Sequence, residues 1–142
     1  MIKVIKNGTV ITMDEKRPEY EKVDIVIVDD TIKKIVKDYK GKADIVIDAN
    51  NKIVMPGLIN CHTHLGMSIF RATNDNLTLD EWLNNKIWPI EDKLTDDDIY
   101  YATLLSCIEM IKTGTVMSND MYFGCDGSIK AIKETKTRSL FG

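Results

Sequence analysis

Two histidines, His62 and His64, lie one residue apart at the end of an apolar stretch that begins at Val54. In an extended chain, side chains two residues apart leave the same face, so both imidazoles can turn toward one point. Neutral imidazole is a good ligand for divalent zinc or iron. The same pair also fits two partly exposed polar residues that end a strand, because short motifs recur by chance. The spacing therefore predicts a metal site only where the surrounding elements hold both rings.

The residues before the histidines form a predicted strand that can hold them. Pro56 and Gly57 indicate a turn, and residues 58–61 follow as a short strand with apolar side chains on both faces. Such a strand is expected to be buried on both sides, as in a parallel sheet covered by helices. The histidines then lie at its carboxyl end. Because Cys61 points away from both of them in a strand, we do not expect it to be a third ligand.

One carboxylate further along the chain has two candidate roles. Thr78 and Glu81 have the spacing of a capping box, which predicts a helix start, and Pro89 is expected to stop or interrupt that helix. Glu91 follows two residues later. It is either an acidic residue at a helix N-terminus, where the helix dipole favours negative charge, or a functional group. The residues alone leave both interpretations open.

The rest of the pattern predicts the order of elements. Strands are expected at residues 23–28, 31–36, 45–48, 52–55, 115–119 and 138–141, with helices from 78, from 95 to 114 and from 126 to 135. Residues 2–12 are expected to form a hairpin that turns at Asn7-Gly8, and residues 13–22 a surface loop. Residues 65–76 are expected to form a long loop. The short N-terminal strands with frequent turns suggest a small β-sandwich.

Four segments together resemble a known family. They are MPGLINCHTHLGMSIFR at 55–71, LDEWLNNKIWPIEDKLT at 79–95, TLLSCIEMIKTGT at 103–115 and NDMYF at 119–123. They resemble the metal-dependent amidohydrolase superfamily. Within it they are most similar to the branch of methylthioadenosine/S-adenosylhomocysteine deaminases, whose members are often labelled chlorohydrolases or cytosine-deaminase-like proteins. The resemblance covers essentially the whole chain.

The resemblance implies a fold and a domain boundary. Residues 1–56 are expected to be the N-terminal part of a β-sandwich domain, and residues 57–142 the first β/α units of an incomplete (β/α)8 TIM barrel. A complete barrel takes about 250 residues. The chain has 142 residues. The fold class is therefore predicted to be α/β, and the chain is expected to be the N-terminal third of such an enzyme.

The resemblance also implies a site. His62 and His64 are expected to be metal ligands, with zinc as the metal and iron or another divalent metal as the alternative. Glu91 is expected to bind the ribose hydroxyls of a nucleoside-type amine, because a carboxylate accepts two hydrogen bonds from a cis diol. The chain has only two histidines. No catalytic residue is therefore expected in it, since the general acid/base and the remaining ligands come from later strands.

The implied activity is deamination of an adenosine-type substrate, such as methylthioadenosine or S-adenosylhomocysteine, by metal-activated water. The chain alone is expected to be inactive. One alternative is a cyclic-amide or triazine (chlorohydrolase-type) hydrolase on the same scaffold. Another is a non-catalytic binding or assembly module, because an incomplete barrel exposes strand edges and apolar faces that favour self-association.

Composition and charge exclude two classes of partner, whereas the small-molecule substrate is what the resemblance implies. The chain is 44% hydrophobic and 29% charged, which is typical of a globular protein, and its net charge is −3. Without a basic surplus, neither nucleic acid nor an anionic membrane is expected as a partner. No apolar run reaches membrane-spanning length, and three widely separated cysteines predict free thiols. We therefore expect a cytoplasmic protein.

Overall fold

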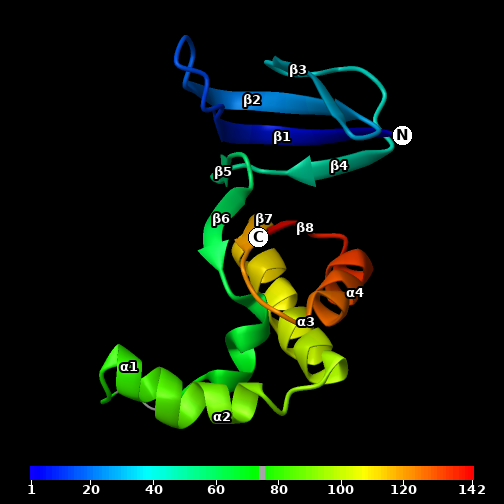
Figure 1. Ribbon diagram of the computed structural model, residues 1–142. Helices are drawn as coiled ribbons and strands as arrows, with labels where there is room; N and C mark the ends of the chain where they lie inside the picture. Colours follow the sequence, from blue (N-terminus) through cyan, green and yellow to red (C-terminus); the bar gives the residue numbers. More distant parts are fainter. Residues whose placement is uncertain (74–75) are drawn as a thin grey trace. The chain divides into compact units, whose positions relative to one another are not determined.

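The computed structural model describes residues 1–73 and 76–142, without the side chain of Glu21. The chain forms two compact units, Met1–Pro56 and Gly57–Gly142. Figure 1 shows a strand-rich first unit and a second unit that mixes strands and helices. Asn74 and Asp75, which belong to the predicted long loop, lie outside the described residues.

The first unit is a five-stranded sheet in which β1 (Ile2–Ile11) is central. It pairs antiparallel with β2 (Glu19–Val28), which pairs antiparallel with β3 (Thr31–Val36). On its other edge β1 pairs in parallel with β4 (Ile45–Asp48) and β5 (Ile53–Val54). These strands are rich in valine and isoleucine, which favour a pleated, half-buried surface. The buried side chains of Val10, Val23 and Ile25 pack together in this unit.

The predicted hairpin at Asn7-Gly8 is wrong, because β1 runs through both residues as one strand. Its register against β2 shifts on either side of Gly8, which is the pattern of a β-bulge. Asn7 has a left-handed φ of 63°, and its N–H donates to Asp24 Oδ1 at 3.0 Å. The left-handed conformation of Asn7, which would also suit a turn, is therefore part of a β-bulge. The predicted loop 13–22 is also too long, since β2 begins at Glu19 and pairs with Ile11.

The second unit contains a parallel sheet of β6 (Leu58–Thr63), β7 (Thr115–Asp120) and β8 (Arg138–Phe141) in that order. The long helix α3 (Asp96–Thr113) precedes β7, and α4 (Cys125–Thr135) connects β7 to β8. The two helices lie side by side in Figure 1. Because parallel strands end at the same edge of a sheet, residues that follow β6 and β7 are brought together.

The predicted start and end of α3 are confirmed. Thr95 Oγ1 accepts the Asp98 N–H at 3.3 Å, and Asp98 Oδ2 accepts the Thr95 N–H at 2.9 Å. Gly114 ends the helix with a φ of 83°, a conformation that glycine adopts without a Cβ penalty.

The predicted helix start at Thr78 is also confirmed by a capping box with Glu81. The α-helical part, α1 (Leu79–Trp82), is short and continues as a π-helical segment, η2 (Leu83–Ile87), and then as α2 (Trp88–Glu91). Pro89 lies in the first turn of α2, directly after η2, and its missing N–H removes one hydrogen bond to the preceding helical turn. The predicted interruption near Pro89 therefore takes the form of a π segment.

Two local predictions in this unit are wrong. Residues 65–70 are not loop but a 3-10 helix, η1 (Leu65–Phe70), whose Ser68 hydroxyl donates to the Ala102 carbonyl of α3 at 2.7 Å. The strand β6 is not buried on both sides, since Leu58 is 51% exposed and Ile59 is 60% exposed. Successive residues of a strand point to opposite faces, so the exposure of Leu58 and Ile59 means that neither face of β6 is covered at these positions by the described residues.

Among the described residues, no helix combines the length and apolar character that a membrane crossing requires.

Candidate functional site

The two histidines lie together at the carboxyl end of β6. His62 is within the strand and His64 directly follows it. Their ring centroids are 4.9 Å apart and the ring planes are nearly perpendicular, at 83°. His62 is exposed and His64 is half-buried. The alternation of β6 thus brings both imidazoles to one place, as their spacing predicts.

The end of β7 fixes the orientation of His64. Its Nδ1 is hydrogen-bonded to the main-chain carbonyl of Met121, and the Met121 N–H donates to the Thr63 carbonyl at 3.0 Å. Because a carbonyl only accepts, Nδ1 carries the proton in this contact. The lone pair of Nε2 is then free for a metal, which is the usual arrangement of a ligating histidine.

Asp120, the last residue of β7, supports the backbone after His64. It is buried, and its Oδ1 accepts the N–H of Leu65 at 2.8 Å. Burial raises the pKa of the Asp120 carboxyl, while the hydrogen bond from the Leu65 N–H acts in the opposite direction. Among the described residues, the other oxygen, Oδ2, has no hydrogen-bond partner. Asp120 thus holds the turn between β6 and η1.

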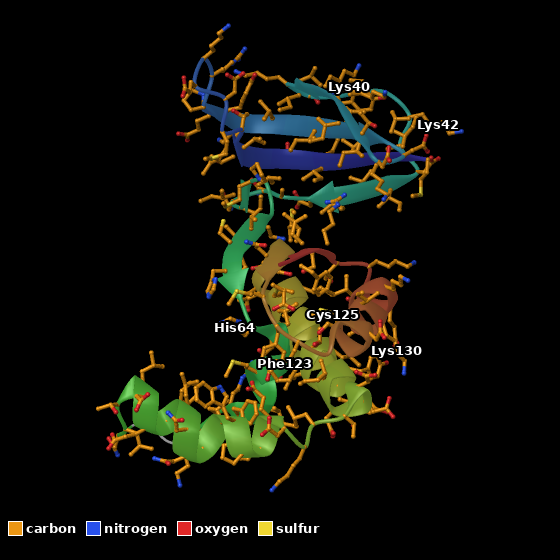
Figure 2. The ribbon with its side chains drawn as sticks, viewed as in Figure 1. Lys40, Lys42, His64, Phe123, Cys125 and Lys130 are labelled. Atoms are coloured by element: carbon orange, nitrogen blue, oxygen red, sulfur yellow. The ribbon has the colours of Figure 1, made fainter. Side chains whose placement is uncertain are left out.

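Glu91 and His64 line the same open cleft, which has a volume of about 540 Å³. The carboxylate of Glu91 accepts a hydrogen bond from the Tyr122 phenol at 2.5 Å. His64 and Phe123, which both line the cleft, are labelled in Figure 2. The cleft wall is mostly apolar and is completed by Met67, Leu83, Ile87, Trp88, Met121, Tyr122 and Gly142.

No role was predicted for Met121, Tyr122 or Phe123 from the sequence, although these residues lie in the NDMYF segment. The available signal was their position directly after a predicted parallel strand, since residues at that edge of a sheet meet those after β6. Their partners, His64 and Glu91, are distant in sequence. Spacing within one segment therefore gave no indication of these contacts.

The residues present fit part of a metal site. The described residues contain no group of three or more histidine, cysteine, aspartate or glutamate side chains that could hold a metal ion. Zinc sites in proteins use three or four protein ligands. The paired imidazoles, with His64 turned to offer Nε2, fit two of these positions. Cys61 is exposed, and its thiol contacts the Ile59 carbonyl at 3.8 Å.

Comparison with known families decides where the chain belongs. Residues 53–142, which include both histidines and the cleft, match the amidohydrolase family. The chain belongs to this family. The α/β fold, with the first β/α units of a barrel preceded by part of a small β domain, agrees with the prediction.

Several curated relatives of this amidohydrolase chain are deaminases. It is 46% identical over 136 residues to the 5'-deoxyadenosine deaminase of Methanosarcina mazei, covering 96% of this chain and 32% of that protein. It is 46% identical over 138 residues to the 5-methylthioadenosine/S-adenosylhomocysteine deaminase of Thermoanaerobacter pseudethanolicus, covering 96% and 32%. The chain thus spans about a third of the length of these relatives.

Solved structures share the fold over nearly the whole chain. An adenosine deaminase from Xanthomonas campestris with bound zinc has a TM-score of 0.90 at 26% identity, covering 97% of this chain and 33% of that one. The atrazine chlorohydrolase of Arthrobacter aurescens TC1, complexed with zinc, has a TM-score of 0.89 at 25% identity, covering 99% and 35%. Amidohydrolases of similar fold therefore include zinc-bound enzymes.

Proposed function

We propose that this amidohydrolase chain is the N-terminal part of a metal-dependent deaminase that acts on an adenosine-type substrate, such as 5′-deoxyadenosine, methylthioadenosine or S-adenosylhomocysteine. Residues 1–56 belong to a β-sandwich domain and residues 57–142 begin the catalytic barrel. The observation that carries the proposal is the pair of imidazoles at the end of β6, one of them lining a cleft with Glu91. The names of the curated relatives support the substrate class.

The metal of the proposed site is zinc, with iron or another divalent metal as the alternative. His62 and His64 are two of its ligands, and the contact of His64 with the Met121 carbonyl supports Nε2 as the ligating atom. A bound zinc lowers the pKa of its water to about 7 and so supplies hydroxide at neutral pH. The remaining ligands and the proton-transferring groups belong to later strands of the full-length protein, so the 142-residue chain alone is inactive.

Glu91 orients the substrate in this proposal. A carboxylate accepts two charge-assisted hydrogen bonds, which matches the adjacent 2′- and 3′-hydroxyls of a ribose. Leu83, Ile87 and Trp88 provide the apolar wall beside Glu91. Such a wall excludes water from the bound nucleoside and strengthens these hydrogen bonds.

The test is turnover by the full-length, zinc-loaded protein. Deamination converts the adenine ring to hypoxanthine, so the ultraviolet absorbance shifts and ammonia is released in equal amount. We expect turnover of 5′-deoxyadenosine that stops when a chelator removes the metal and returns when zinc is restored. Metal-loaded protein that leaves every adenosine derivative unchanged would contradict the proposal.

A triazine or cyclic-amide hydrolase is a second candidate, favoured by the structural likeness to a triazine hydrolase with a TM-score of 0.88. The same preparation is therefore assayed with atrazine and with a cyclic amide. Loss of chloride from atrazine, or opening of the amide ring, without turnover of adenosine derivatives would favour this candidate instead.

A further inference from the structure

Tyr122 connects the two functional regions of the cleft. It follows the end of β7, lines the cleft with His64 and Glu91, and donates its phenolic hydrogen to Glu91 Oε1 at 2.5 Å. Glu91 reaches this contact from the end of α2, which is separated from β7 by the whole of α3. The hydrogen bond therefore ties the α2 segment to the edge of the sheet that carries the histidines.

The packing around Tyr122 holds its ring in one place. The ring stacks on Phe123, with centroids 4.3 Å apart and planes 25° apart, and lies 6.2 Å from the His64 ring. A Cβ at Gly66 would lie 2.6 Å from Cδ1 and Cε1 of Tyr122, so only glycine leaves room for the ring there. Because these contacts restrict the ring, the hydroxyl is a fixed donor.

The phenol also keeps its proton at neutral pH. Burial raises the pKa of Tyr122 above its usual value, and the adjacent Glu91 carboxylate raises it further. A protonated phenol has one hydrogen to donate, and the carboxylate has about four acceptor positions. The contact at Oε1 therefore leaves the Glu91 carboxylate able to accept further hydrogen bonds.

We infer that Tyr122 is a positioning residue, which holds Oε1 of Glu91 so that Oε2 faces the cleft and accepts from the ribose diol of the substrate. This inference rests on the proposed function, since it assigns Tyr122 a role in binding the same nucleoside. Tyr122 itself does not take part in the chemical step.

The experiment compares two substrates in the full-length, zinc-loaded protein. One is 5′-deoxyadenosine and the other is its analogue without the 2′- and 3′-hydroxyls. Tyr122→Phe keeps the stacked ring and removes the donor. For 5′-deoxyadenosine we expect kcat/KM to fall about tenfold, mainly through KM, which is typical for losing a hydrogen bond to a charged group. For the analogue we expect a change of less than about twofold, since there is no diol for Glu91 to bind.

Tyr100→Phe is the matched control. The Tyr100 phenol donates to Glu134 Oε2 at 2.7 Å, between α3 and α4 and outside the cleft. This variant removes the same kind of hydrogen bond, so we expect equal kcat/KM ratios for the two substrates before and after the change. A Tyr122→Phe loss of the same size on both substrates, or a diol-dependent loss in Tyr100→Phe, would overturn the inference.

A crystallographic measurement makes the result independent of turnover. In the full-length wild-type protein we expect the phenol on one oxygen of Glu91, and in Tyr122→Phe a displaced carboxylate. A wild-type structure in which Tyr122 does not contact Glu91, or an unmoved carboxylate in the variant, overturns the inference. Absent turnover of adenosine derivatives by the wild-type protein instead contradicts the proposed function, and the two failures are thereby distinguished.

Discussion

At the scale of single residues, the contact between the His64 ring and the Met121 carbonyl determines which nitrogen is left for a metal. The alternation of side chains in a strand was enough to predict that His62 and His64 share a face. It could not predict the partner of His64, because that carbonyl reaches the histidine through the pairing of β6 with β7. The same holds for Glu91, whose hydrogen bond to Tyr122 joins residues far apart in the chain.

Removing one of the paired imidazoles tests the metal proposal. We expect His64→Ala in the full-length protein to lower zinc affinity by at least about tenfold, since even partners of ligands contribute that much. The affinity is measured by competition with a chromophoric chelator. Cys61→Ser is the control, because Cys61 is exposed in the same strand and its thiol contacts a main-chain carbonyl. Zinc affinity that stays at the wild-type value in His64→Ala would argue against this residue as a ligand.

At the scale of helices and strands, the sequence patterns that predicted the structure correctly were those that depend only on neighbouring residues. Thr95, Asp98 and Gly114 delimit α3 as expected, because a capping box and a left-handed terminal glycine need only neighbouring residues. The predictions that were wrong concern segments whose conformation depends on contacts with residues distant in the sequence. Asn7 is in a bulge because the rest of β1 remains paired, and η1 is helical where Leu65 and Phe70 are buried.

The capping box of α3 should make the free energy of unfolding depend on pH. The hydrogen bonds from Thr95 lower the pKa of Asp98 below its usual value. A carboxyl whose folded pKa is depressed stabilises the fold above its unfolded pKa, and this stability is lost as the pH falls through the folded pKa. We expect Thr95→Ala to cost about 1 kcal/mol of unfolding free energy at pH 7. Below about pH 4, where an unperturbed aspartate takes up its proton, the cost should become smaller.

The measurement is urea unfolding of wild type and Thr95→Ala, followed by circular dichroism at several pH values. Thr78→Ala is the comparison, since Thr78 caps only the short α1, which has no buried residue. A cost that does not change between neutral and acid pH would show that the Asp98 carboxylate is not involved.

The close approach of α4 to α3 depends on Gly127. A Cβ on Gly127 would overlap the Asp96 carbonyl oxygen and lie 2.9 Å from the Tyr100 nitrogen. Glycine to alanine inside a helix ordinarily stabilises it by up to about 1 kcal/mol. Here the helices must separate, so we expect Gly127→Ala to destabilise the fold by about 1–3 kcal/mol. Gly114→Ala is the contrast, because its Cβ would meet no atom and only the left-handed backbone costs free energy.

The effect of each variant on stability is measured as the urea concentration at the midpoint of unfolding. A higher midpoint for Gly127→Ala than for wild type would mean that the helices are not in backbone contact. This role of Gly127 could not be predicted from the sequence, because a glycine in a helical pattern indicates only a weak helix former.

At the scale of the whole molecule, the resemblance of four segments was sufficient to predict the family and the α/β fold. Burial was predicted less well, because it depends on which elements cover a strand. Apolar side chains are exposed along the small parallel sheet, including Leu58, Ile59, Val116 and Leu140. An exposed strand edge and apolar surface of this kind favour association.

We therefore expect the 142-residue chain to self-associate in a concentration-dependent way. Sedimentation velocity over a range of concentrations measures this. Ile59→Lys places a charge on the exposed edge strand β6 and should shift the population toward monomer. A wild-type chain that sediments as a folded monomer at all concentrations would contradict this expectation.

The π-helical segment η2 determines how this region responds to a change in chain length. A π turn accommodates about one residue more than an α turn. Deleting a single residue between Leu83 and Ile87 would therefore return the segment to α geometry and leave the residues after it in nearly the same orientation. Glu91 would still face Tyr122, whereas the same deletion within α3 would rotate the residues after it by about 100° about the helix axis.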